Sequence, residues 1–145
     1  MKKPPPGWPR ISAGVYYLDP VAAIDWLVRA FGFEVRVRIE GDAGQIVHSE
    51  VTYGEGLVMV GGAGDAALRP DSDQQSPKAL GGANTQKLCI YVDDVDAHYA
   101  RAVAAGAQVK RELATTDYGA EYWVDRSYEA ADPEGHRWYF VQRMS

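Results

Sequence analysis

Two stretches of this chain are similar enough to indicate an internal duplication. When Tyr17–Val35 is placed over Tyr91–Val109 without a gap, at an offset of 74 residues, seven of the 19 positions are identical. The identical residues include an aspartate before a predicted helix (Asp19 and Asp93), an alanine inside it and a glycine behind it. The choice of residue type is most restricted at these positions, at the start and the end of a helix. The sequence therefore predicts two copies of one structural unit.

The first copy predicts a strand, a helix and then three strands. A strand over Ile11–Leu18 precedes Asp19 and Pro20, which give an N-cap and a proline at the first helical position. Apolar residues at helical spacing continue to Phe31, and Gly32 can adopt the left-handed conformation that ends a helix. Three further strands are predicted over Phe33–Ile39, Ile46–Tyr53 and Leu57–Val60.

The second copy repeats this order, with Asp93 or Asp94 as the helix cap and Gly106 behind the helix. Its strands are predicted over Lys87–Val92, over Gln108–Leu113 and on both sides of the turn Asp132–Gly135, with a loop at Thr115–Tyr122. The predicted fold class is α+β with two tandem βαβββ modules, 8–62 and 86–145, in one combined domain. The Gly-, Ala- and Ser-rich segment 63–85 is a linker or a lid over a site.

Composition excludes several classes of function. The net charge is −5 and the pI is near 5.1, without the clustered Lys and Arg that a nucleic-acid surface needs. The first ten residues lack the apolar core of a signal peptide, and no later apolar run is long enough to enter a membrane. The single cysteine, Cys89, excludes an internal disulfide and is expected in a buried strand. A cytoplasmic protein is predicted.

The chain resembles the vicinal-oxygen-chelate superfamily, which contains glyoxalases, bleomycin-resistance proteins and extradiol dioxygenases. The segments that carry the resemblance are AAIDWLVRAFGFEV, IVHSEVTYGEGLVMVGG, YVDDVDAHYARAVAAGA and DYGAEYWVDRSYEAADPEGHRWYF. The resemblance covers nearly the whole chain, from Trp8 to Gln142, and implies that the two modules form a curved mixed sheet around a cavity, often in a homodimer. Many enzymes of the superfamily hold a divalent metal in that cavity.

The resemblance also gives the positions of the metal ligands, one on the first and one on the last strand of each module. Here these positions carry Ser12, Gln86 or Lys87, Val60 or Met59, and Tyr139. Divalent ions need several converging oxygen or nitrogen donors, which this set does not supply. We therefore expect no metal and no cofactor.

The histidines are interpreted by their positions. His48 and Glu50 alternate along one predicted strand, so they share a face that is either a cavity wall or a solvated surface. On a cavity wall, Glu50 would be a base or His48 a hydrogen-bond donor. His98 is predicted to be structural or exposed, and His136, in a tight turn, to face solvent or bond to the backbone.

Aromatic and cationic residues are concentrated near the end of the chain. Along the last strand, Trp138 and Phe140 alternate with Arg137 and Tyr139. Since Tyr139 corresponds to a cavity-facing ligand position, we assign the first pair to the core on the helix side and the second pair to the cavity. Further ligand-binding candidates are Tyr16, Tyr91 and Arg126.

Two hypotheses follow. The favoured one is a metal-free small-molecule-binding protein of the glyoxalase/bleomycin-resistance type, which sequesters or senses a planar or aromatic compound. The alternative is a metal-dependent lyase, isomerase or dioxygenase-like enzyme whose ligands have moved to the neighbourhood of His48 and Glu50.

Overall fold

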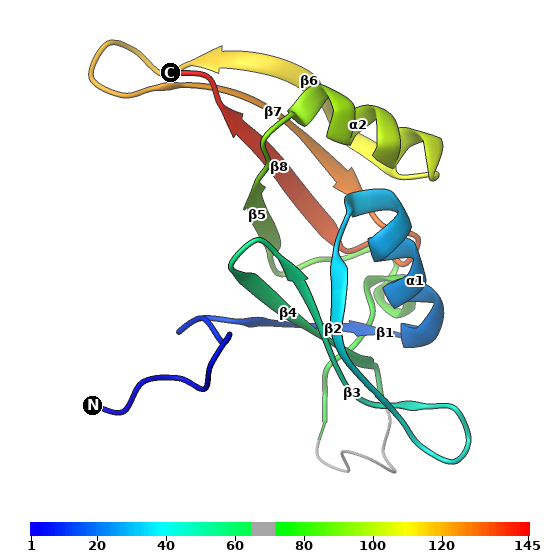
Figure 1. Ribbon diagram of the computed structural model, residues 1–145. Coiled ribbons are helices and arrows are strands. Elements are labelled where there is room, and N and C mark those ends of the chain that lie inside the picture. The colour runs from blue at the N-terminus through cyan, green and yellow to red at the C-terminus, as the bar shows by residue number, and fades with distance from the viewer. Residues whose placement is uncertain (65–71) are drawn as a thin grey trace.

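The computed structural model describes residues 1–64 and 72–145 and contains the two predicted βαβββ modules (Figure 1). The first module consists of β1 (Ala13–Tyr17), α1 (Pro20–Phe31), β2 (Glu34–Glu40), β3 (Ile46–Tyr53) and β4 (Gly56–Gly62). The second consists of β5 (Lys87–Tyr91), α2 (Val95–Ala104), β6 (Gln108–Asp117), β7 (Val124–Ala131) and β8 (Arg137–Arg143). A short 3-10 helix, η1 (Pro77–Leu80), lies between them. Residues 65–71 of the predicted linker or lid lie outside the described residues.

Each module forms a four-stranded mixed sheet with the same strand order. Sheet 1 has the order β1-β4-β3-β2, and sheet 2 has the order β5-β8-β7-β6. In both sheets the first and last strands of the module are parallel, and the other pairs are antiparallel. The identical topology confirms the duplication inferred from the sequence.

The two helices begin where the sequence predicts, and an aspartate caps the N-terminus of each. The Asp19 carboxylate accepts a hydrogen bond from the Ala22 amide, and the N–H of Gly32, at φ 77°, closes the other end of α1. For α2 the sequence left the cap open between two aspartates. The structure selects Asp94, whose carboxylate accepts from the Ala97 amide at 3.0 Å.

The β6–β7 hairpin is longer than the sequence predicts. Residues Thr115–Asp117 were expected to begin a loop, but they continue β6 and pair with Val124–Arg126 of β7. The pairing is possible because β7 extends equally far, so that only residues 118–123 are left to form the tip of the hairpin. The tip carries Tyr118 and Tyr122, which the sequence placed in a loop, and also Trp123.

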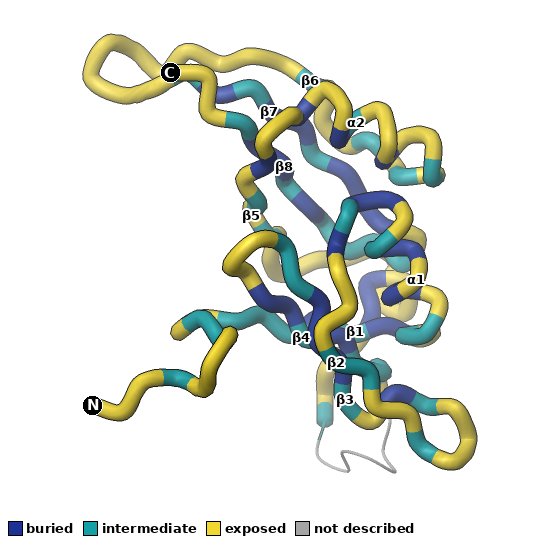
Figure 2. Tube along the Cα trace, viewed as in Figure 1, coloured by how far each residue is buried: buried dark blue, intermediate teal, exposed yellow. Residues whose placement is uncertain are grey.

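Both helices lie on one side of the two sheets (Figure 1), and Figure 2 shows buried residues along the strands and along both helices. One apolar core contains residues of both modules. Phe31 of α1 contacts Trp138 and Phe140 of β8, at ring-centroid distances of 5.7 Å and 4.6 Å. The assignment of Trp138 and Phe140 to the core on the helix side is therefore confirmed.

Polar contacts also join the modules. The Tyr17 hydroxyl donates to Asp132 at 2.7 Å, and the Trp26 indole N–H donates to the Ala105 carbonyl at 2.9 Å. The described end of segment 63–85 is packed against the same region, because the buried Ser76 donates to Glu134 at 2.6 Å. Within residues 1–64 and 72–145, no helix is long and apolar enough to span a membrane.

Two of the histidines are structural. His98 is buried between the modules, with Nε2 2.8 Å from the Phe31 carbonyl oxygen and Nδ1 2.6 Å from the Tyr128 hydroxyl. His136 takes the second of its two predicted roles, since its Nε2 lies 2.6 Å from the Tyr16 carbonyl oxygen.

Candidate functional site

The side of each sheet that faces away from the helices, here called its open face, carries six of the seven predicted ligand-binding residues. On sheet 1 these are Tyr16, His48 and Glu50, and on sheet 2 they are Tyr91, Arg137 and Tyr139. The predicted residues therefore fall into two separate groups.

Arg126 is the seventh, and the structure does not bring it to either open face. Its guanidinium binds Asp96 of α2 through two nitrogens, at 2.8 Å and 2.9 Å. The strand alternation explains this position, because Arg126 shares the helix side of β7 with the buried Tyr128. Arg126 was predicted because it lies in the segment rich in aromatic and cationic residues near the end of the chain. The alternation of side chains along its strand was not used to assign its face.

On sheet 1, His48 and Glu50 share a face as predicted and contact each other. His48 Nε2 lies 2.9 Å from Glu50 Oε1, and Arg36 Nη1 lies 3.4 Å from Glu50 Oε2. Arg36 also donates to the carbonyl oxygens of Pro6 and Gly7, at 2.9 Å and 3.1 Å. The N-terminal arm is thus attached to the open face of sheet 1 next to the His48–Glu50 pair.

On sheet 2, Tyr139 is surrounded by positive charge. Lys87 Nζ lies 5.0 Å and Arg111 Cζ 4.8 Å from the centroid of the Tyr139 ring, within the range of cation–π attraction. The Tyr139 hydroxyl donates to Ser127 at 3.2 Å. The ring therefore lies along the open face toward β7, with cations beside it.

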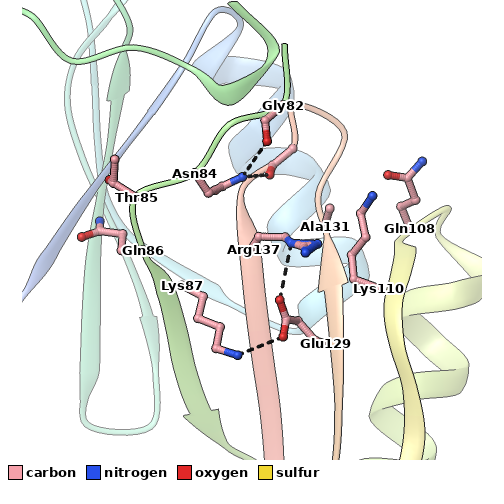
Figure 3. Close-up of a pocket in the computed structure, with 11 residues that line it drawn as sticks. Gly82, Asn84, Thr85, Gln86, Lys87, Gln108, Lys110, Glu129, Ala131 and Arg137 are labelled. Carbon is pink, nitrogen blue, oxygen red and sulfur yellow. Dashed lines mark hydrogen bonds and ion pairs between the residues drawn. The ribbon is translucent and has the colours of Figure 1, made fainter. Parts of the chain in front are cut away.

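A pocket of about 620 Å³ lies at the end of the open face of sheet 2 where β5 and β8 begin (Figure 3). Glu129 Oε2 pairs with Lys87 Nζ at 3.0 Å, and Glu129 Oε1 lies 3.4 Å from Arg137 Nε. A third cation, Lys110, also lines the pocket and forms no ion pair with any residue that the structure describes. One carboxylate thus faces three cations, so the pocket has a net positive charge although the chain is acidic overall.

Cys89 corrects a further prediction. It was expected to be buried, but it is exposed on the open face of sheet 2, where it pairs in register with Tyr139. The alternation of β5 turns Leu88 and Ile90 to the core instead. Partial desolvation by the neighbouring groups, together with the nearby Asp125 charge, raises the pKa of the Cys89 thiol above its ordinary value although the residue is exposed.

The residues at the inherited metal positions do not fit a divalent ion. Val60 is buried in the core, and Lys87 carries a positive charge that repels a cation. The other positions carry the Ser12 hydroxyl, the Gln86 amide and the Tyr139 hydroxyl instead of imidazoles and carboxylates. The Tyr139 hydroxyl already donates a hydrogen bond to Ser127. Among the described residues, no group of three or more His, Cys, Asp or Glu is arranged to hold a metal ion.

Four residues of the sheet 2 face were missed at the sequence level, namely Lys110, Arg111, Asp125 and Glu129. Lys110 and Arg111 flank a register shift in β6, where counting alternate residues no longer assigns a face. Asp125 alternates with Ser127 and Glu129, so the alternation of β7 was a signal that could have found it.

Comparison with known proteins agrees with this architecture. Residues 12–140 match the model of the Glyoxalase/Bleomycin resistance protein/Dioxygenase superfamily. The chain belongs to this superfamily. The resemblance to the vicinal-oxygen-chelate superfamily is thereby confirmed.

Several relatives have similar length. Uncharacterized proteins of Mycobacterium bovis (strain ATCC BAA-935 / AF2122/97) and Mycobacterium tuberculosis (strain ATCC 25618 / H37Rv) are 32% identical over 134 residues. The match covers 92% of this chain and 83% and 74% of those proteins, respectively.

Solved structures give the same result. TioX from Micromonospora sp. ML1 is 34% identical with a TM-score of 0.70, over 92% of this chain and 98% of TioX. A glyoxalase/bleomycin resistance protein/dioxygenase family enzyme from Burkholderia phytofirmans PsJN has a TM-score of 0.65 at 18% identity, over 90% of this chain and 95% of that one. At that identity the second likeness shows the fold alone.

Proposed function

We propose that this protein binds a planar or aromatic small molecule with a negative charge on the open face of sheet 2, for sequestration or sensing and without a catalytic metal. The observation that carries the proposal is the Tyr139 ring with Lys87 and Arg111 over it. The ring offers an apolar contact for a planar compound, and the cations attract an acidic group. The positively charged pocket around Glu129 extends the same surface.

The charge balance favours an anion. Glu129 neutralises one of the three cations of the pocket, and Arg111 forms no ion pair with the described residues. A ligand carboxylate or phosphate would therefore gain charge-assisted hydrogen bonds without displacing an existing salt bridge. A neutral ligand would gain only the contact with the ring.

The alternative, a metal-dependent enzyme near His48 and Glu50, has one supporting contact, the 2.9 Å approach of these two residues. Two donors do not make a metal site, and the Arg36 guanidinium, 3.4 Å from Glu50, repels a cation there. The structure therefore gives more support to binding on sheet 2.

A binding experiment with 1-benzothiophene-3-carboxylate, a planar aromatic acid, tests the proposal. At 100 times its dissociation constant, such a probe should stabilise the protein by about 2.7 kcal/mol. Tyr139→Ala and Arg111→Ala should weaken binding in calorimetric titration, whereas Arg126→Ala, on the helix side of the same sheet, should not. Equal binding by all three variants would contradict the site.

Cys89 supplies a readout that is specific to this face. Because Cys89 pairs in register with Tyr139, a ligand over the Tyr139 ring should slow alkylation of the thiol in the native protein.

Elemental analysis of protein purified without chelator tests whether the protein is free of metal. Near-stoichiometric metal that is lost in His48→Ala or Glu50→Ala would favour the enzyme alternative instead.

We further propose a homodimer in the cytoplasm. Apolar side chains of the first module, Val35, Ile39 and Val47, are exposed, and a second copy is a partner that would cover them. Light scattering at micromolar concentration should give twice the mass of the chain, and a monomer would contradict this part of the proposal.

A further inference from the structure

Asp125 has a carboxylate oxygen with no partner, although the residue is only 5% exposed. It lies on the open face of sheet 2, next to Ser127 in the alternation of β7. Its Oδ2 accepts a hydrogen bond from the Trp123 indole N–H at 2.9 Å. Its Oδ1 is buried and receives no hydrogen bond from any described residue, and no described cation pairs with the carboxylate.

Such an oxygen is unusual in a folded protein. Buried polar atoms nearly always have a hydrogen-bond partner. In the unfolded chain such an atom bonds to water, so burying it without a partner costs the free energy of that hydration. A carboxylate oxygen only accepts hydrogen bonds, so it needs a donor from another group. The structure thus has an acceptor site for a donor that the described chain does not supply.

The surroundings of Asp125 indicate what kind of donor fits. Tyr118 and Trp123 lie beside it at the hairpin tip, with ring centroids 6.2 Å apart. The pKa of Tyr118 is raised by the neighbouring Tyr139 and, to a smaller extent, by Asp125. The acceptor therefore lies beside the aromatic rings of the hairpin tip, on the same face as Tyr139.

We propose that Asp125 Oδ1 accepts a hydrogen bond from a ring N–H of the ligand, so that the ligand class is planar aromatic acids with a ring N–H that points away from the acid. This inference rests on the proposed function, since it uses the same face of sheet 2. The cations beside Tyr139 attract the acidic group, and the Asp125 charge repels it. The two ends of the ligand are thereby distinguished, which fixes its orientation on the sheet.

In this proposal, a movement of the Tyr118 side chain gives the ligand access to Oδ1. Tyr118 is 48% exposed and lies at the hairpin tip, where an aromatic side chain can change rotamer without disturbing the core. The Trp123 hydrogen bond to Oδ2 keeps the carboxylate in its orientation while this occurs.

Two matched probes test the inference. Indole-3-carboxylate and 1-benzothiophene-3-carboxylate have nearly the same shape and the same acid, but the first has an N–H where the second has a sulfur atom. A hydrogen bond to a charged acceptor should make the indole bind at least about tenfold more tightly to the unaltered protein, as measured by calorimetric titration. This comparison needs no variant, so it does not depend on a substitution that impairs folding.

Asp125→Asn then tests the residue. The asparagine oxygen can still accept from Trp123, which leaves the amide nitrogen, a donor, at the position of Oδ1. The preference for the indole should fall to about threefold or less, through weaker indole binding rather than tighter benzothiophene binding. Asp117→Asn, which removes the same charge from an exposed site on the same hairpin, should retain the full preference.

The outcomes separate the two proposals. Equal binding of both probes to the unaltered protein, or an undiminished preference in Asp125→Asn, would overturn the role of Asp125 and leave the proposed function standing. If neither probe bound at millimolar concentration, the proposed function and this inference would both be wrong.

Discussion

Trp138 and Tyr139 are neighbours in β8 and have opposite surroundings. Trp138 is 1% exposed, contacts Phe31 and Phe33, and donates its indole N–H to Asp132 at 3.0 Å. Tyr139 lies on the open face among cations. The pleat of the strand separates a residue that stabilises the core from one that is available to a ligand.

Substitution of each residue by alanine should therefore have different effects. Trp138→Ala should lower the free energy of unfolding by roughly 3–5 kcal/mol, because it leaves a cavity in the shared core. Tyr139→Ala should change it by about 1 kcal/mol or less while weakening ligand binding. Urea denaturation followed by circular dichroism measures both, and similar losses in the two variants would contradict the assignment of faces.

His98 gives a pH dependence of stability with a defined sign. Burial is the main cause that lowers its pKa below the usual value, although the hydrogen bond to Phe31 acts in the other direction. The folded protein thus keeps His98 neutral at a pH at which the unfolded chain is protonated. Stability from this group is complete above the unfolded pKa of about 6.5 and is lost as pH falls from there toward the folded pKa.

The expected contribution is a slope of up to about 1.4 kcal/mol per pH unit in that window. Carboxylates also titrate in this range, so the measurement is the difference between the unaltered protein and His98→Gln. Denaturation midpoints between pH 5 and 7 should depend less on pH in the variant. Parallel pH profiles would show that His98 does not titrate differently on folding.

At the scale of elements, the start of α1 is held by the other module. The Glu134 carboxylate, in the β7–β8 turn, accepts hydrogen bonds from the amides of Leu18 and Asp19, at 2.6 Å and 3.0 Å. It also accepts from Ser76 at 2.6 Å. A negative charge at a helix N-terminus is favourable, so Glu134 supports α1 in addition to the local Asp19 cap.

Glu134→Ala should lower the free energy of unfolding by about 2 kcal/mol, because three donors lose a charged acceptor. Glu121→Ala, which removes an exposed carboxylate from the hairpin tip, is the matched control and should change it by at most about 0.5 kcal/mol. Thermal and urea unfolding test this directly. An equal effect of the two substitutions would mean that the contacts of Glu134 add no stability.

At the scale of the whole molecule, the two modules share one core and are joined by contacts between residues far apart in the chain. Trp26 to Ala105, Tyr17 to Asp132 and His98 to Phe31 all cross the boundary. Neither module retains these partners when it is alone. We therefore propose that the pair of modules folds as one unit.

Unfolding should accordingly occur in a single transition. Tryptophan fluorescence, which reports Trp8 and Trp26 of the first module and Trp123 and Trp138 of the second, should change at the same urea concentration as the circular dichroism of the backbone. Separate midpoints for the two signals would show that one module unfolds before the other.

The sequence by itself determined the duplicated βαβββ order, both helices and the face of each residue in β8. These features depend on local rules, namely capping aspartates, terminal glycines and the periods of helix and strand, which act within a few residues. The same rules brought His48 and Glu50 to one face. The local rules failed at β6, because the register shift near Lys110 and Arg111 interrupts the two-residue alternation of side chains between the faces of the sheet.

Only the tertiary structure decided which groups from different strands meet. The approach of Lys87 and Arg111 to Tyr139 depends on the pairing of β5, β8, β7 and β6, which are far apart in the chain. Likewise, Arg126 pairs with Asp96 of α2, and Cys89 is exposed because no element that the structure describes packs over its face of β5. Alternation assigns a residue to one of two faces, but the packing of whole elements decides which face is covered, and this packing placed the candidate site on sheet 2.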